Sequence, residues 1–267
     1  MALTITSPQN PRVKQVVRLR DRRHREREGR LLVEGSEELA LALASGARLE
    51  ALFVCPALLQ DDQAALLEQA RAAAAEVFEV SPPVFEKMAY RDNPDGWLAV
   101  LPAVRRGLDD LPSAERALLL IAEAIEKPGN LGALLRSADA AGATGVIVCD
   151  PTTDINNPNV VRSSRGTLFT VPVVETTAAE AFAWLRARGI AVVAATPQAA
   201  QAYTEADLTG PVAIAVGAEH AGLSEAWLAQ ASLQVRIPML GQVNSLNVAT
   251  AATLLLYEAV RQRAAAH

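Results

Sequence analysis

The chain has little cysteine and few aromatic residues. Among 267 residues there are two cysteines, and Phe, Trp and Tyr make up only 4%. Cys55 and Cys149 lie in apolar, strand-like segments and share no metal-ligand spacing. This favours buried thiols in a reducing compartment over a disulfide framework. The three histidines are scattered, so we expect no structural zinc site and no other metal.

Long hydrophobic runs are also missing. No apolar segment approaches the roughly 20 residues that a membrane span needs. The first residues, MALTITSPQNPRVK, lack a continuous apolar stretch preceded by positive charge, which argues against a secretory signal. Apolar residues still make up 51% of the chain, enough for a packed core. We therefore expect a cytoplasmic protein of one large or two ordinary domains, with no membrane partner.

The net charge of −5 argues by itself against nucleic acid, but the charges are unevenly distributed. Residues 1–30 carry nine Lys or Arg against three acidic residues, and the rest carries 16 basic and 27 acidic residues. Such an arginine-rich block, concentrated in residues 10–30, is typical of a phosphate-binding surface. The alternative is a solvated amphipathic helix, and charge alone leaves both interpretations open. Its inward-facing residues would be Val13, Val16, Val17 and Leu19.

The chain divides into two patterned halves. Residues 1–101 alternate short apolar and helical segments, which predicts a small α/β domain. Residues 102–116 combine proline, glycine and charged residues, a composition that predicts a linker. In residues 117–267, Val- and Ile-rich runs without alternation are separated by helical stretches, which predicts a parallel sheet covered on both faces. Ligands of such sheets bind at the carboxyl ends of the strands.

The individual elements follow from the same patterns. Strands are expected at 31–35, 48–56, 77–80, 96–102, 117–125, 145–149, 169–174, 190–196, 211–219 and 233–239. Helices are expected at 36–46, 57–76, 81–89, 130–142, 176–189 and 223–230. The apolar stretch from 248 onward is expected to form a last, buried helix.

The first of three notable loops is EKPGNLGALLRSADAAGA, residues 126–143. Its proline and glycines force an irregular turn and leave backbone N–H groups free at a helix start. Arg136 is turned away from the apolar face of that helix, within reach of an anion near the loop. The alternative is a surface arginine paired with Asp139.

Two further loops follow later strands. In VGAEHAGLSEAWL, residues 216–228, Gly217 lets a ligand approach the backbone, and Glu219 sits inside the loop. In RIPMLGQVNSLNVAT, residues 236–250, apolar side chains surround a turn rich in amides, which suits a flat heteroaromatic ring such as adenine. A helix needs one polar cap, and we expect Asn244 to provide it.

Together, in order and spacing, these loops resemble the SpoU or TrmH-like class of RNA methyltransferases in the SPOUT superfamily. The matching segments are KPGNLGALLRSADAAGA, VGAEHAGLS, IPMLGQVNSLNVATA and RSSRGTLFTVPVV. The resemblance covers residues from about 117 to 262. Residues 1–101 look like the accessory substrate-binding domain of the family, which resembles a small α/β RNA-binding ribosomal protein.

The resemblance implies a deep trefoil knot in the C-terminal domain, where residues alone indicate a plain doubly wound sheet. It also implies S-adenosylmethionine as cofactor, a homodimer formed through the C-terminal domain, and methyl transfer to a ribose 2′-hydroxyl of RNA. Ribosomal RNA is favoured over transfer RNA. The expected catalytic residues are Asn130, Arg136, Glu219, Ser245 and Asn247. The expected cofactor-binding residues are Thr196, Gly217, Ile237, Met239 and Leu246. The expected RNA-binding residues are Arg12, Lys14, Arg18, Arg22, Arg23 and Arg165.

Three alternatives remain open. A non-catalytic RNA-binding protein could keep this fold, and a resistance-type ribosomal RNA methyltransferase shares its plan. A nucleotide-dependent oxidoreductase also fits a parallel α/β sheet, but the chain lacks the GxGxxG fingerprint. The sequence does not identify the target nucleotide.

Overall fold

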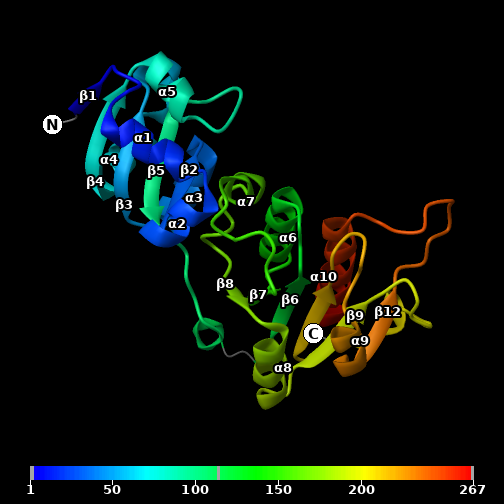
Figure 1. Ribbon diagram of the computed structural model, residues 1–267. Helices are drawn as coiled ribbons and strands as arrows, with labels where there is room; N and C mark the ends of the chain where they lie inside the picture. Colours follow the sequence, from blue (N-terminus) through cyan, green and yellow to red (C-terminus); the bar gives the residue numbers. More distant parts are fainter. Residues whose placement is uncertain (1–2, 113–114, 266–267) are drawn as a thin grey trace. The chain divides into compact units, whose positions relative to one another are not determined.

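The computed structural model describes residues 3–112 and 115–265 (Figure 1). Its contacts divide the chain into two compact units. The first unit runs to Val104 and also includes Asp154–Thr170, and the second holds Arg105–Thr153 and the residues from Val171 onward. The segment Asp154–Thr170, expected inside a continuous second domain, therefore packs with the first unit.

The first unit is built on a five-stranded sheet with the order β1-β4-β3-β5-β2. β5 runs antiparallel to β2 and β3, whereas β1 and β3 run parallel to β4. The strands are β1 (Leu3–Ile5), β2 (Arg30–Glu34), β3 (Leu49–Val54), β4 (Ala74–Val80) and β5 (Trp97–Pro102). The helices are α1 (Pro11–Arg18), α2 (Arg22–Glu28), α3 (Ser36–Ala44), α4 (Ala64–Ala73), α5 (Pro82–Met88) and α7 (Pro158–Ser163).

The basic segment forms the amphipathic helix α1 followed by α2. Asn10 caps α1 by accepting a hydrogen bond from the Arg12 N–H, and Pro11 occupies the first turn. Val13, Val16 and Leu19 are buried against the sheet, in the same core as Phe53 and Phe78. The amphipathic interpretation is therefore confirmed for α1, whose Lys14 and Arg18 are exposed.

One predicted helix is partly wrong. Residues 57–76 were expected to be helical, but the regular helix α4 is limited to Ala64–Ala73, and β4 begins at Ala74. Ala74 is paired with Leu49 of β3, so strand pairing overrides the helix propensity of the alanines there. Short 3₁₀ turns at Pro56–Leu58 and Asp61–Gln63 occupy the start of the predicted helix.

The second unit contains a seven-stranded, wholly parallel sheet with the order β10-β12-β9-β11-β6-β7-β8. This confirms the predicted parallel sheet. The strands are β6 (Leu118–Glu123), β7 (Gly145–Cys149), β8 (Val173–Thr176), β9 (Ala191–Ala195), β10 (Gln201–Ala202), β11 (Val212–Val216) and β12 (Leu233–Arg236). The helices are α6 (Pro128–Ala140), α8 (Ala178–Ala187), α9 (Glu225–Gln230) and α10 (Val248–Ala265). Short 3₁₀ turns lie at Leu108–Asp110 and Tyr203–Glu205.

Helices cover both faces of this sheet. Phe182 and Trp184 of α8 and Trp227 of α9 pack with Leu119 and Ile121 of β6 in one core. On the other face α6 and α10 lie side by side (Figure 1), joined by a hydrogen bond of 2.6 Å between the hydroxyls of Ser137 and Thr253. Because both faces are covered, the strands need no polar alternation.

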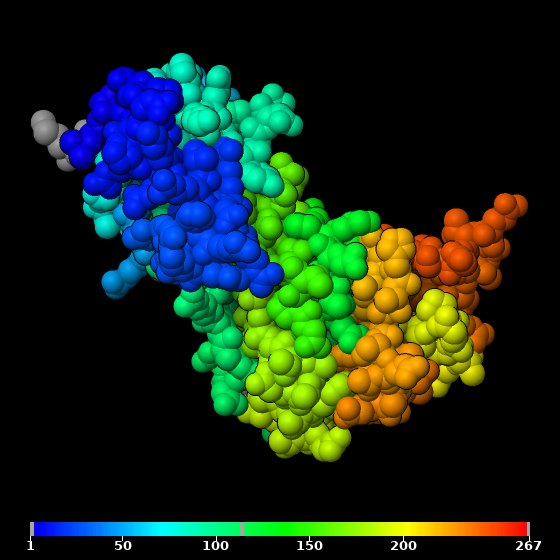
Figure 2. All heavy atoms as spheres, viewed as in Figure 1, coloured from blue at the N-terminus to red at the C-terminus, as the bar shows by residue number. Residues whose placement is uncertain are grey.

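The chain leaves β12 beside β9 and returns to the middle of the sheet, where α10 packs against β6 and β11. The knot expected from the resemblance needs such a return. The intervening segment carries Leu240, whose side chain is 98% exposed. In Figure 2 the orange residues that follow β12 stand out from the rest of the second unit.

Both cysteines are buried and free, and burial raises the pKa of each thiol. Within residues 3–112 and 115–265, no helix is long and apolar enough to span a bilayer. The same residues hold no cluster of His, Cys, Asp or Glu side chains placed to bind a metal.

Candidate active site

The three loops singled out in the sequence converge at the carboxyl ends of β6, β11 and β12. Two of them, with the end of β9, enclose a pocket of about 730 Å³, counting the part open to solvent. The lining residues are Ala195, Thr196, Pro197, Val216, Gly217, Ala218, Glu219, Gly222, Val235, Ile237, Met239, Asn244, Ser245, Leu246, Val248 and Ala251. All five expected cofactor-binding residues are among them.

The loop after β11 is a tight turn that only glycine permits at position 217. A Cβ built on Gly217 would lie 2.1 Å from the carbonyl oxygen of Gly222 and 2.4 Å from the nitrogen of Leu223. The Gly222 N–H donates to the Ala218 oxygen at 2.9 Å, which closes the turn. Gly222 itself has a φ of +69°, a conformation that favours glycine. The turn therefore places Glu219 at the pocket rim on a fixed backbone.

Glu219 connects the first two loops through hydrogen bonds. One carboxylate oxygen accepts from the Lys127 ammonium and the other from the Asn130 side-chain amide. These two bonds hold the pKa of Glu219 below its usual value. Because a lowered pKa favours the charged form, Glu219 is an ionised carboxylate at neutral pH.

Asn247 joins the third loop to the same network and also caps α10. Its side-chain amide donates to the Asn130 oxygen at 3.1 Å. Its own side-chain oxygen accepts from the N–H groups of Ala249 at 2.9 Å and Thr250 at 3.4 Å. The prediction that Asn244 caps this helix is therefore wrong. The helix begins at Val248, so the residue just before it is the cap, and Asn244 lines the pocket instead.

The remaining predicted catalytic residues lie in different settings. Ser245 lines the pocket between Asn244 and Leu246. Arg136 is exposed on α6, and its side chain forms no hydrogen bond or ion pair with the residues the structure describes. The structure thus brings Asn130, Glu219 and Asn247 together directly and places Ser245 in the pocket that Glu219 also lines. Arg136 does not join them.

Two residues of this region were not predicted from the sequence. Lys127 forms an ion pair with Glu219. Its position beside Pro128 in the first loop was the sequence feature that could have marked it as a site residue. Glu123, at the end of β6, is buried and accepts a hydrogen bond of 2.7 Å from the Ser224 N–H, which follows the Gly217 turn. A carboxylate at the carboxyl end of a parallel strand could have been flagged for this role.

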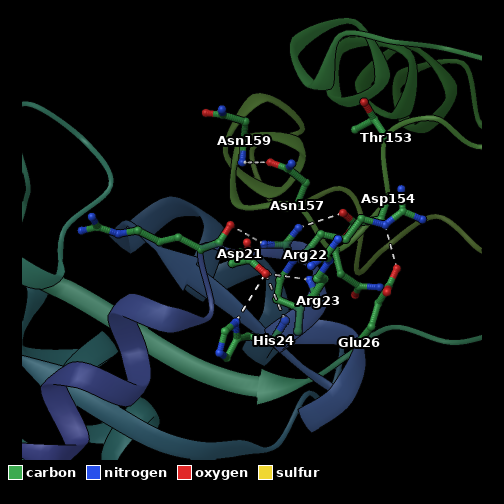
Figure 3. A network of polar contacts seen from close by, with 12 residues as sticks. Asp21, Arg22, Arg23, His24, Glu26, Thr153, Asp154, Asn157 and Asn159 are labelled. Carbon is green, nitrogen blue, oxygen red and sulfur yellow. Dashed lines mark hydrogen bonds and ion pairs between the residues drawn. The ribbon is translucent and has the colours of Figure 1, made fainter.

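The six expected RNA-binding residues separate into two groups in the first unit. Arg12, Arg22 and Arg165 are paired with Glu76, Glu26 and Glu37, respectively. Figure 3 shows the Arg22–Glu26 pair beside the capping residue Asp21. Lys14, Arg18 and Arg23 are exposed and have no ion pair within the described ranges.

One arginine of the basic block is structural. Arg25 is only 2% exposed, and its guanidinium donates to Asp154 at 2.8 Å and to the backbone oxygens of Leu19 and Arg20. These contacts hold α2 against the segment Asp154–Thr170, whose Asn157 caps α7 (Figure 3). The basic composition of residues 10–30 therefore serves packing as well as surface charge.

Comparison with known proteins agrees with this architecture. The SpoU rRNA Methylase family matches residues 117–257, and the MRM3-like substrate binding domain matches residues 10–99. The fold and the pocket define a SPOUT-type methyltransferase with an accessory domain. The chain belongs to the SpoU rRNA methylase family.

Similar proteins cover nearly the whole chain. The 23S rRNA (uridine(2479)-2′-O)-methyltransferase of Streptomyces viridochromogenes is 36% identical, over 92% of this chain and 87% of that protein. The 23S rRNA (guanosine(2553)-2′-O)-methyltransferase RlmP of Bacillus subtilis is 30% identical, over 95% of this chain and 97% of that protein.

Solved structures give the same result. The crystal structure of an RNA 2′-O ribose methyltransferase has a TM-score of 0.86 and 45% identity, covering 98% of this chain and 100% of that one. The methyltransferase AviRb of Streptomyces viridochromogenes in complex with AdoMet has a TM-score of 0.88 and 34% identity. The match covers 96% of this chain and 99% of that one.

Proposed function

We propose that this protein is an S-adenosylmethionine-dependent methyltransferase that modifies a ribose 2′-hydroxyl of ribosomal RNA in the cytoplasm. The observation that carries this proposal is the joining of the loops after β6, β11 and β12 in one site. There an apolar pocket borders the network of Lys127, Glu219, Asn130 and Asn247. The relatives that act on 23S rRNA support ribosomal RNA over transfer RNA as the substrate.

The residues of the pocket fit this cofactor. Gly217 has no side chain, so the turn can close on Gly222 and form one wall of the pocket, and Ile237, Met239 and Leu246 offer apolar surface to an adenine ring. Thr196, largely buried, adds a hydroxyl to the same wall. When bound, S-adenosylmethionine supplies a methyl group activated by its sulfonium sulfur.

The polar residues position the acceptor ribose. A carboxylate with a lowered pKa is a weak base, so Glu219 is better suited to fixing Asn130 and Lys127 than to taking the hydroxyl proton. Asn130 and Asn247 hold each other by a hydrogen bond, and Ser245 lines the pocket next to Leu246. Alignment of the hydroxyl with the transferred methyl is the main catalytic requirement, and a rigid network supplies it.

Arg136 takes the role of a clamp for the substrate phosphate and a stabiliser of the developing alkoxide. Its guanidinium stays protonated at any physiological pH, which makes it unsuited to accept a proton. Because it has no partner within the described ranges, its charge is available to RNA.

The protein also acts as a homodimer through its second unit. On α10, Leu254 is 38% exposed and Tyr257 is 46% exposed, although the neighbouring Leu255 and Leu256 are buried. A single copy leaves these apolar side chains in water, and a second copy would cover them.

Binding and transfer assays on the full-length protein test the proposed function. We expect S-adenosylhomocysteine to raise the melting temperature, while NAD and ATP leave it unchanged. We expect methyl transfer to unmodified 23S rRNA, with loss of at least tenfold in kcat for Arg136→Ala and with cofactor affinity retained. Stabilisation by NAD alone would point to an oxidoreductase. Cofactor and RNA binding without transfer would point to a non-catalytic RNA-binding protein.

A further inference from the structure

Tyr90, in the loop between α5 and β5, is an exposed aromatic residue of the first unit. Its side chain is 40% exposed, and Tyr90 and Tyr257 are the only exposed large aromatics in the part of the chain that the structure describes. Tyr257 lies on α10, in the second unit. An exposed ring in the substrate-binding unit calls for a separate explanation.

The Tyr90 ring is held in place from outside its own loop. Its hydroxyl accepts a hydrogen bond of 2.8 Å from the side-chain amide of Asn159 in α7. Its backbone N–H donates to a carboxylate oxygen of Glu34, the last residue of β2, at 2.7 Å. A side chain fixed at both ends loses little conformational freedom when a ligand contacts it, which favours binding.

A guanidinium lies over one side of the ring. The Cζ of Arg20 is 6.0 Å from the ring centroid. Arg20 is itself fixed, because its Nη2 donates to the backbone oxygens of Lys87 at 3.0 Å and Ala89 at 2.5 Å. With Arg20 on one side, the exposed part of the ring is left for a second flat partner.

Exposed cations on three neighbouring elements offer contacts to an anionic ligand, although Glu86 beside Lys87 is also exposed. Arg18 in α1, Lys87 in α5 and Arg162 in α7 are exposed, and none of them forms an ion pair with a described residue. The adjacent carboxylate of Glu34 is largely buried and already accepts hydrogen bonds from the backbone N–H groups of Tyr90 and Arg91. Asp92, two residues after Tyr90, is the exposed acid of the same loop.

We propose that Tyr90 is a stacking platform for an unpaired base of the substrate RNA, with Arg20 supporting the ring from its other side. Stacking on tyrosine and arginine is the general way in which proteins hold splayed-out bases. The inference rests on the proposed function only in taking RNA as the substrate. A protein partner at the same ring is the competing occupant.

The test measures the affinity of the full-length protein for unmodified 23S rRNA made by transcription, at several salt concentrations. Removing one base stack weakens binding by about 5- to 100-fold, so we expect that loss for Tyr90→Ala. Stacking releases no counterions, so the slope of log affinity against log salt should stay unchanged. Tyr90→Phe keeps the ring and should stay within about threefold of wild type. Arg18→Gln is the matched control, because losing a phosphate contact should reduce the slope by about one.

Several outcomes would overturn the platform. These are unchanged affinity of Tyr90→Ala, an equal loss in Tyr90→Phe, or a changed salt slope in Tyr90→Ala. The melting temperature and S-adenosylhomocysteine affinity of each variant separate loss of stacking from loss of folding. If Tyr90→Ala is unstable, Tyr90→Leu fills the same site without an aromatic face, and unchanged RNA affinity in that variant would contradict the proposal.

The same data separate this inference from the proposed function. If wild type binds 23S rRNA without methylating it, the proposed enzyme activity is wrong. The RNA affinities of the Tyr90 variants then still show whether Tyr90 stacks on a base. If wild type binds neither 23S rRNA nor bulk transfer RNA, the platform is wrong, and Tyr90 becomes a candidate contact for a protein.

Discussion

At the scale of single residues, the site depends on positions where one side chain alone fits. Gly217 has no room for a Cβ, because Gly222 folds back onto it. Asn247 uses its oxygen to cap α10 and its amide to hold Asn130. The sequence predicted both residues to be functional through the family resemblance. It could not show that Asn247, rather than Asn244, is the cap, because that depends on where the helix begins.

Gly217→Ala should reduce the affinity for S-adenosylhomocysteine by at least about tenfold, since the new methyl group must displace the Gly222 backbone. Isothermal titration of the purified variant measures this effect. Gly210→Ala is the control, because a Cβ there would meet no atom within 4 Å. Equal affinities of Gly217→Ala and wild type would show that the turn does not shape the cofactor pocket.

Asn247→Ala should lower the free energy of unfolding by about 1 kcal/mol, the usual effect of losing a helix cap. Asn244→Ala should leave stability close to wild type, because Asn244 makes no cap bond to α10 within the described residues. Asn247→Asp keeps the capping oxygen and loses the donor to Asn130. It should therefore retain stability and lose activity. Urea unfolding combined with a methyl-transfer assay measures both properties, and a destabilised Asn244→Ala would reverse the assignment.

At the scale of elements, the buried strands were the easiest to predict. β6, β7, β9 and β11 are continuous apolar runs covered by helices on both faces, so their pattern was unambiguous. The two-residue β10 and the three-residue β1 were missed, because strands that short carry no periodicity. The alanines at the start of β4 were predicted to be helical. They form a strand because Ala74 pairs with Leu49 of β3, which is distant in the sequence. The segment Asp154–Thr170 packs with the first unit through contacts such as Arg25–Asp154, which composition cannot reveal.

The Arg25–Asp154 pair should be the strongest polar contact between α2 and that segment. Arg25→Met leaves Asp154 buried without its cation, and we expect a loss of about 3 kcal/mol in the free energy of unfolding. Arg22→Met removes an exposed pair and should cost less than about 1 kcal/mol. The double variant Arg25→Met with Asp154→Leu should recover part of the loss. Equal effects of the two arginine changes in urea unfolding would show that the buried pair does not matter for packing.

At the scale of the whole molecule, a small α/β unit with a basic helical surface is joined to a methyltransferase unit. The net charge of −5 hides this division, because the positive charge is concentrated in residues 1–30. Yet Arg25 is buried, and Arg12 and Arg22 are already paired with acids. RNA affinity should therefore depend on Lys14, Arg18 and Arg23 more than the net charge of the block suggests.

The most direct test of the central claim is methyl transfer to unmodified 23S rRNA, followed by mapping of the modified nucleotide. The proposed function predicts one principal 2′-O-methylated site that appears only with S-adenosylmethionine. It further predicts that replacing the ribose at that site with deoxyribose abolishes transfer. Methylation that persists on the deoxyribose substrate would place the methyl group on a base and contradict ribose 2′-O-methylation.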